Sequence, residues 1–240
     1  MNKLTIIVHG RSASTLMLKL LQSTHEFTLW GGSPTDECGV FRNHPETWHE
    51  ETIRREWGKV DKSKPVLAKL PAFAYFIEEM LTLEPDVIVL ERPIMDIVKS
   101  YAAVGWMTDV LDKHREWDIL EKASKKYSEL GGVNTDDPYH RLAVVFAWSH
   151  WKTRRALEHY PRKLFIHYRD FMEDPYAVID RLEDFLDIEI HREEWIHLMK
   201  NRHQATGRPP ILNYSATLSI QIPKLSPKRI CDATQRFGCL

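Results

Sequence analysis

Short apolar runs rich in β-branched residues alternate with helical patterns along this chain, and this alternation constrains its fold more than any other feature. The runs are residues 4–8, 66–68, 87–91 and 164–168. Apolar residues at helical spacing occur in four places, namely after the first run, after Pro71, over residues 138–160 and after Pro175. Strands that alternate with amphipathic helices are typical of a parallel sheet with helices on both faces. We therefore predict a three-layer α/β/α fold with a central parallel sheet, in a single domain that covers residues 1–240.

The charge balance of the chain excludes one broad class of binding protein. Its 240 residues include 33 Lys and Arg against 34 Asp and Glu, which gives a net charge of −1. A protein that coats nucleic acid or an anionic membrane needs a general excess of basic residues. We therefore expect no nucleic-acid partner, although a few Arg and Lys side chains can still form a local anion site.

The apolar runs, cysteines and histidines bear on location and metal binding. No apolar run approaches the roughly 18–20 residues of a membrane span, and the first run is too short for the core of a signal peptide. The three cysteines form no C-x-x-C pair, and the 12 histidines show no H-E-x-x-H spacing. We expect a cytoplasmic protein with no membrane span and no metal site.

The segment after the first apolar run has the composition of an anion-binding loop. A strand there leads through small and hydroxyl residues directly into a helix, where unpaired N–H groups and the helix dipole attract anions. The residues concerned are Gly10, Arg11, Ser12, Ala13, Ser14 and Thr15. One alternative is that Ser12 or Ser14 only caps the helix. Another is a Walker loop, whose second Gly and Gly-Lys-Ser/Thr end are missing here.

A second anion-binding pattern follows the run at residues 87–91. Arg92 stands at the end of this expected strand, and Ser100 follows eight residues later, in the second turn of the next expected helix. A forked guanidinium and a hydroxyl placed in this way can meet at one phosphate. The alternative is a surface arginine and a serine that faces its own helix. Asp96 lies between them, and we expect it to have a structural role.

Both patterns match one known family. The first loop, Gly-Arg-Ser-x-Ser-Thr after an N-terminal strand, resembles the 5′-phosphosulfate loop of sulfotransferases that use 3′-phosphoadenosine 5′-phosphosulfate (PAPS). Members of that family usually have Gly at the position of Ala13 in this loop. The Arg-Pro-x-x-Asp-x-x-x-Ser pattern of residues 92–100 is similar to the 3′-phosphate motif of the same family. The resemblance implies the P-loop-like sulfotransferase fold. It also implies that residues 10–15 hold the 5′-phosphosulfate, and that Arg92 and Ser100 hold the 3′-phosphate.

Two further segments resemble parts of the same family. Residues 167–175 look like a segment that ends a strand and starts a helix, in which Tyr168 lies near the adenosine or packs in the core. Residues 201–209 look like the basic loop that closes over PAPS. Arg208 is the candidate in this loop for a further phosphate contact, and a plain surface loop is the alternative.

The resemblance also implies catalytic residues. Arg11 would neutralise the charge that grows on the bridging oxygen as the sulfuryl group leaves. One branch of the family has a Glu soon after the first helix and a Lys after the second strand, and this chain has a similar arrangement. It implies Glu37 as the general base and Lys69 as a charge stabiliser near the sulfate. The alternative bases are Asp36, His44 and His49.

Together these patterns predict a PAPS-dependent sulfotransferase that needs no metal. It would move a sulfuryl group to a hydroxyl or amine of a small-molecule or carbohydrate acceptor and release 3′-phosphoadenosine 5′-phosphate (PAP). The alternatives are a P-loop kinase of small molecules or nucleotides and a catalytically silent nucleotide-binding protein on the same fold. The acceptor would lie against residues 37–59 and 106–137, and the polar segment 108–132 is either a solvent-exposed helix or a lid.

The tryptophans have both functional and structural interpretations. Four of them can stack on a planar acceptor or simply pack, namely Trp30, Trp48, Trp106 and Trp117. Trp148 and Trp151 lie on the long helix expected before the last apolar run, and we expect them to be part of the core.

Overall fold

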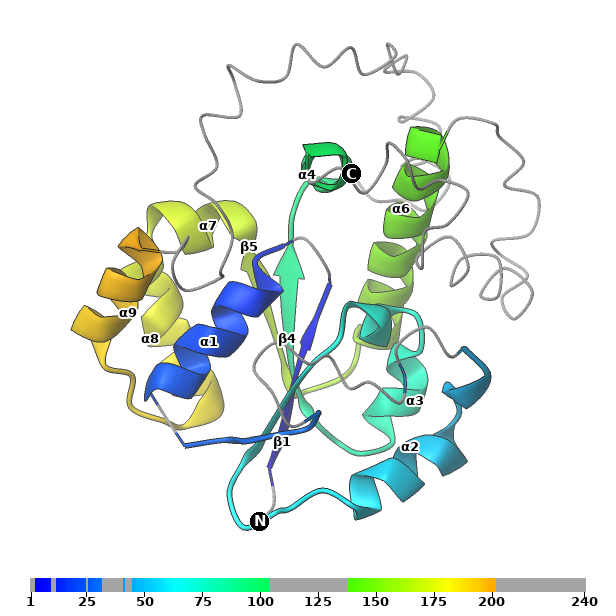
Figure 1. The fold of residues 1–240 in the computed structure, drawn as a ribbon, viewed down its shortest axis with the longest axis horizontal. Coiled ribbons are helices and arrows are strands. Elements are labelled where there is room, and N and C mark those ends of the chain that lie inside the picture. The colour runs from blue at the N-terminus through cyan, green and yellow to red at the C-terminus, as the bar shows by residue number, and fades with distance from the viewer. Residues whose placement is uncertain are drawn as a thin grey trace.

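Five parallel strands form the centre of the molecule. A computed structural model of the chain describes residues 3–9, 12–24, 26–31, 41, 45–103 and 138–201. The strands lie in the order β2-β3-β1-β4-β5, so β1 is at the middle of the sheet (Figure 1). Their bounds are β1 Leu4–Val8, β2 Thr28–Leu29, β3 Val66–Lys69, β4 Asp86–Glu91 and β5 Lys163–His167. All four neighbouring pairs are parallel, which confirms the predicted parallel sheet.

Helices cover both faces of this sheet. Figure 1 shows one group on the left of the sheet, which comprises α1 Ser14–Thr24, α7 Tyr168–Glu173, α8 Pro175–Leu186 and α9 Arg192–Lys200. The group on the right comprises α2 Glu50–Gly58, α3 Ile77–Leu81 and α6 Pro138–Ala156. Helix α4 (Ile94–Ala103) lies beyond the carboxyl end of β4, and two short 3₁₀ helices are η1 Pro45–Thr47 and η2 Pro71–Ala74. The three-layer prediction is therefore confirmed. None of the described helices is long and apolar enough to cross a membrane.

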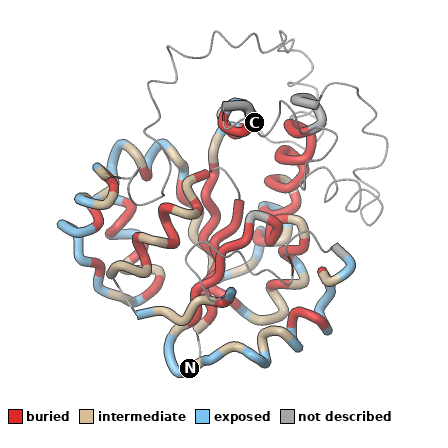
Figure 2. Tube along the Cα trace, viewed as in Figure 1, coloured by how far each residue is buried: buried red, intermediate tan, exposed pale blue. Residues whose placement is uncertain are grey.

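The core consists of two apolar clusters, one on each face of the sheet. Successive strand residues point to opposite faces, so Ile6 and Val8 of β1 join one cluster and Ile7 joins the other. The three inner strands β3, β1 and β4 are accordingly buried along their whole length, while the outer faces of the helices are exposed (Figure 2). Burial on both faces explains why the strands read in the sequence as continuous apolar runs.

The described tryptophans belong to the core. Trp148 is fully buried, and Trp151 packs against the same cluster, as expected. Trp48 is also fully buried, stacks on Phe76 with ring centroids 4.9 Å apart and donates its indole N–H to a backbone carbonyl. Trp30 is buried beside Trp57. Packing is therefore the correct interpretation for Trp30 and Trp48, and Trp106 and Trp117 lie outside the described residues.

Element boundaries differ from the predictions at three places. The last strand ends at His167, the last residue paired with β4, so Tyr168 begins α7 and is not part of the strand. The long helix ends at Ala156 and not at residue 160, because the backbone tightens into i,i+3 bonds at Glu158 and Tyr160 before Pro161. The segment after Pro71 forms η2 and α3 separately, because Phe76 leaves the helical conformation between them.

Some elements were not predicted, and some predictions cannot be placed. Strand β2 has only two residues, too few to show a period, and it forms by pairing with β3. Helices α2 and α9 carry few buried apolar residues, so their sequences show no strong helical pattern. The polar segment 108–132 and residues 202–240 lie outside the described residues.

A buried carboxylate joins three strands at the amino end of the sheet. Asp86 begins β4 and is 3% exposed. It accepts a hydrogen bond from Arg162 Nε at 2.8 Å, and its other oxygen lies 3.2 Å from Lys3 Nζ. Lys3 precedes β1 and Arg162 precedes β5, so this one side chain ties the starts of three neighbouring strands together.

We expect the Asp86→Asn variant to lose about 2 kcal/mol of unfolding free energy, because an amide cannot balance the two cations at this buried position. This loss of unfolding free energy is smaller than that for a fully buried ion pair, because both cations are partly exposed to water. Urea unfolding monitored by circular dichroism measures it. Asp184→Asn, at an exposed position on α8, is the matched control and should change stability by less than about 0.5 kcal/mol. Equal stabilities for the two variants would contradict the assignment.

Candidate functional site

Several predicted site residues meet at the carboxyl edge of the sheet. Ile7 of β1 is paired with Lys69, the last residue of β3, and Glu91 of β4 is paired with His167 of β5. The residues that follow these strands therefore share one edge. This is the edge at which open α/β sheets bind ligands.

The loop after β1 combines a distorted backbone with buried hydroxyl groups. His9 and Ala13 both have positive φ angles, of 74° and 69°. Ser12 and Ser14 are buried at 0% and 4% exposure, and Thr15 is half-buried in the first turn of α1. Gly10 and Arg11 lie outside the described residues.

The start of α1 tests the alternative that a serine in this loop only caps the helix. The carbonyl of Ala13 accepts the first helical hydrogen bond, from Met17 N at 2.9 Å, so Ala13 occupies the N-cap position. Neither Ser12 nor Ser14 is the N-cap residue. Ala13 has no side-chain acceptor, and the first turn of α1 carries no acidic residue that would offset the positive end of the helix dipole.

The conformation of Ala13 explains why glycine is usual at this position in the family that the loop resembles. At a φ of 69° the chain is in the left-handed region, which glycine enters freely and which costs a residue with a Cβ roughly 1 kcal/mol. Alanine has the smallest side chain that meets this strain. The chain therefore keeps a glycine-like backbone at Ala13.

Arg92 and Tyr168 form a stacked pair directly beyond the paired ends of β4 and β5. The guanidinium carbon of Arg92 lies 4.3 Å from the centroid of the Tyr168 ring, and both residues are half-buried. Stacking uses the face of the guanidinium, whereas its N–H donors lie in its plane and can still point toward an anion. Tyr168 thus supports Arg92, and a contact between Tyr168 and an adenosine stays a prediction.

Ser100 and Asp96 both lie on α4, the helix that follows Arg92. Ser100 is 6% exposed and lies in the second turn, as predicted. Asp96 lies in the first turn, where a carboxylate stabilises the positive end of a helix, and its Oδ1 is 4.0 Å from Lys99 Nζ. The expected structural role for Asp96 is consistent with this position.

Of the predicted catalytic residues and rival bases, the structure describes Lys69 and His49. Lys69 ends β3 and is 7% exposed. His49 is the N-cap residue of α2, where its ring accepts a hydrogen bond from Thr52 N, and α2 lies toward the amino ends of the strands (Figure 1). Four other candidates lie outside the described residues, namely Asp36, Glu37, His44 and Arg208. The described residues contain no group of three His, Cys, Asp or Glu side chains placed to hold a metal ion.

A pair of buried histidines lies beside the anion-binding loop, and sequence reasoning missed it. The rings of His9 and His150 of α6 have centroids 4.1 Å apart, at 2% and 7% exposure. Burial lowers the pKa of His150 to about 4, with a smaller contribution from the nearby charge of Arg154. Burial also lowers the pKa of His9 well below its usual range, and His150 and Arg154 act in the same direction. Both rings are therefore neutral at pH 7.

An ion pair lies one helical turn from this histidine pair. Arg154 Nη2 is 2.7 Å and 2.8 Å from the two carboxylate oxygens of Glu91, which is 6% exposed. His167 Nδ1 lies 3.5 Å from the same carboxylate. His150 and Arg154 are four residues apart, so the sequence alone could have placed them on one face of α6. Their partners are 63 or more residues away in the sequence, where no local pattern reveals them.

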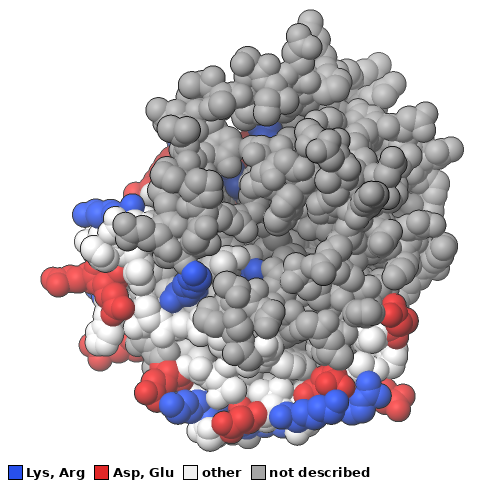
Figure 3. Space-filling model, viewed as in Figure 1, with Lys and Arg blue, Asp and Glu red and all other residues white. Residues whose placement is uncertain are grey.

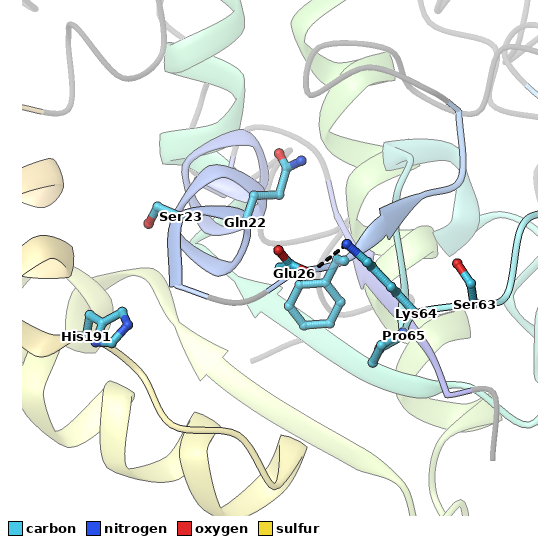
Figure 4. Close-up of a pocket in the computed structure, with 8 residues that line it drawn as sticks. Gln22, Ser23, Glu26, Ser63, Lys64, Pro65 and His191 are labelled. Atoms are coloured by element: carbon cyan, nitrogen blue, oxygen red, sulfur yellow. Dashed lines mark hydrogen bonds and ion pairs between the residues drawn. The ribbon is translucent and has the colours of Figure 1, made fainter.

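An open pocket of about 670 Å³ lies away from this edge. The residues labelled in Figure 4 come from the end of α1 and from the segments before β2, β3 and α9, at the amino side of the sheet. An ion pair between Glu26 and Lys64 crosses it. On the described surface in Figure 3, acidic and basic side chains are interspersed along the lower edge. We assign the functional site to the carboxyl edge, where the predicted anion-binding residues gather.

Comparison with protein-family models identifies one family for this chain. A family model described as sulfotransferase domain matches residues 38–224, more than three quarters of the chain, and this match begins after the loop at residues 10–15. Two solved structures show a more distant similarity to the chain. The sulfotransferase domain from the curacin biosynthetic pathway has 16% identity and a TM-score of 0.48 over 80% of this chain and 76% of that one. Sulfotransferase STF9 from Mycobacterium avium has 12% identity and a TM-score of 0.49 over 87% and 69%. No curated protein matches the chain significantly.

We expect the buried histidine pair to make the fold sensitive to acid. A histidine whose pKa is lower in the folded chain takes up its proton more readily when unfolded, so stability falls as the pH drops from about 6.5 toward 4. Between pH 7 and pH 5, His150 alone should cost about 2 kcal/mol of unfolding free energy. Urea unfolding at both pH values measures this loss. The His150→Phe variant should lose about 2 kcal/mol less than the wild type over this interval, whereas His159→Phe, at an exposed position, should behave as the wild type does. Parallel losses in all three proteins would contradict the assignment.

Proposed function

Because this chain belongs to the sulfotransferase domain family, we propose that it transfers a sulfuryl group from PAPS to a hydroxyl or amine of a small-molecule or carbohydrate acceptor. The observation that carries this proposal is that the two segments with predicted anion-binding patterns follow neighbouring strands at one edge of the sheet. Val8, the last residue of β1, is paired with Val89 of β4, so the loop after β1 and Arg92 after β4 are neighbours. Family membership favours this activity over that of a P-loop kinase.

The two segments suit the two charged ends of PAPS. On the 5′ side, the proposal uses the start of α1 together with the loop residues Gly10, Arg11, Ser12, Ala13, Ser14 and Thr15. On the 3′ side it uses the in-plane donors of Arg92, held by Tyr168, and the hydroxyl of Ser100. Arg208 is a further proposed phosphate contact.

The proposed chemistry is a single displacement at sulfur. The acceptor oxygen or nitrogen forms a bond to sulfur, the bond from sulfur to the bridging oxygen breaks, and that oxygen keeps the electron pair as part of PAP. Glu37 takes the proton that the acceptor loses. Arg11 and Lys69 stabilise the negative charge on the bridging and sulfuryl oxygens, so the positive charge in this proposal comes from side chains. The burial of Lys69 strengthens this interaction, because water screens it less there.

The Arg92→Ala variant tests the 3′-phosphate assignment. We expect it to weaken PAP binding by more than about 1.5 kcal/mol, which is more than tenfold in Kd, because it removes a charged hydrogen-bond donor. Isothermal titration calorimetry measures this change, with circular dichroism as a check of folding. The matched control is Arg169→Ala, an exposed arginine that pairs with Glu173 on its own helix and should leave PAP binding unchanged. An unchanged Kd for Arg92→Ala would overturn the assignment.

The Glu37→Gln variant tests the proposed base. It should bind PAP as the wild type does and transfer label from PAPS at least about a hundredfold more slowly, because the amide cannot accept the proton. Transfer is measured with labelled PAPS across carbohydrate, phenol, steroid, lipid and peptide acceptors. Asp36→Asn, at the neighbouring rival base, is the control and should keep the wild-type rate. Full activity of Glu37→Gln moves the role elsewhere, and a wild-type protein that binds PAP but sulfates no acceptor supports the catalytically silent alternative.

A further inference from the structure

The backbone pairing of β1 and β4 ends before the two anion-binding segments begin. The last paired residues are Val8 and Val89, whereas the first loop starts after His9 and the second segment starts at Arg92. The ladder therefore sets the spacing of the strands and does not reach the residues that would bind the two phosphates. Contacts beyond the ladder must hold these segments in place.

Helix α6 makes the first of these contacts, at the end of β1. Val8 belongs to the core cluster that contains α6, and strand alternation would turn the next side chain to the opposite face. The ring of His9 nevertheless packs on His150 of α6. The positive φ of His9 accounts for this break in alternation, so the direction in which the chain enters the loop depends on the contact between the two rings.

The same helix makes the second contact, at the end of β4. Arg154 follows His150 by one turn, about 6 Å along the helix, and it holds both oxygens of Glu91. Glu91 is the residue directly before Arg92. Glu91 is 6% exposed, whereas the Arg154 side chain is 58% exposed, so the carboxylate end of this ion pair is buried and the guanidinium reaches it from the surface.

We propose that His150 and Arg154 are positioning residues, which set the distance between the 5′-phosphosulfate loop and Arg92 by fixing the ends of β1 and β4 to one rigid helix. This inference rests on the proposed function, since it concerns how the two phosphates of one nucleotide are bound together. A ligand that carries both phosphates benefits from correct spacing, and a ligand that carries only one does not. The neutral state of both imidazoles allows their rings to touch without repulsion.

The test compares PAP with adenosine 5′-monophosphate, which has the 5′-phosphate alone. His150→Ala and Arg154→Met should each weaken PAP binding at least tenfold and change the Kd of adenosine 5′-monophosphate less than threefold. Competition against a fluorescent PAP analogue measures both constants. His150→Phe keeps a ring and Arg154→Lys keeps a charge, so both should retain PAP binding within about threefold of the wild type.

The matched controls are Arg155→Met, at an exposed position in the last turn of α6, and His159→Ala, at an exposed position three residues after that helix, and both should leave the two constants unchanged. Equal weakening of the two ligands would overturn the inference, because it would indicate damage to the loop and not a loss of spacing. If both His150→Ala and Arg154→Met bind PAP with the affinity of the wild type, the inference is overturned as well. If His150→Ala does not fold, Arg154→Met decides alone. Failure of the wild type to bind PAP would instead overturn the proposed function.

Discussion

Parallel pairing of the strands is the constraint on which the rest of this structure depends. In a parallel sheet every strand ends at the same edge, so the segments after β1, β3, β4 and β5 are brought together however far apart they are in the sequence. An antiparallel β4 would place Arg92 at the opposite end of the sheet from the loop after β1. The helices on both faces bury the sheet and leave its edge as the place where polar side chains can gather.

Charges are distributed along the strands in a way that follows from this arrangement. β4 has a buried carboxylate at each end, Asp86 and Glu91, and each is balanced by basic side chains from other elements. Glu91 lies on the α6 face, whereas Arg92 packs on Tyr168. A net charge of −1 for the whole chain is compatible with a positive local site, because the net charge does not describe how charges are distributed over the molecule.

The loop after β1 combines strain with support. His9 and Ala13 both adopt left-handed backbone conformations, which are unfavourable for residues with a Cβ. Such conformations persist where packing determines them, and here the His150 ring packs on His9 while the α1 helix starts at Ala13. A loop held in this way is organised in advance, so the proposed binding of an anion would cost less conformational entropy.

The sequence by itself determined the fold class, the positions of β1, β3, β4 and β5 to within a residue or two, and the family, because burial period and loop composition are local properties. It placed Arg92 and Ser100 on the correct elements, and it predicted an anion-binding loop at Ser12 and Ser14. Only the tertiary structure decided that Tyr168 supports Arg92, that Trp48 is core, and that α6 reaches both strand ends through His150 and Arg154. These contacts join residues far apart in the chain, and folding alone brings them together.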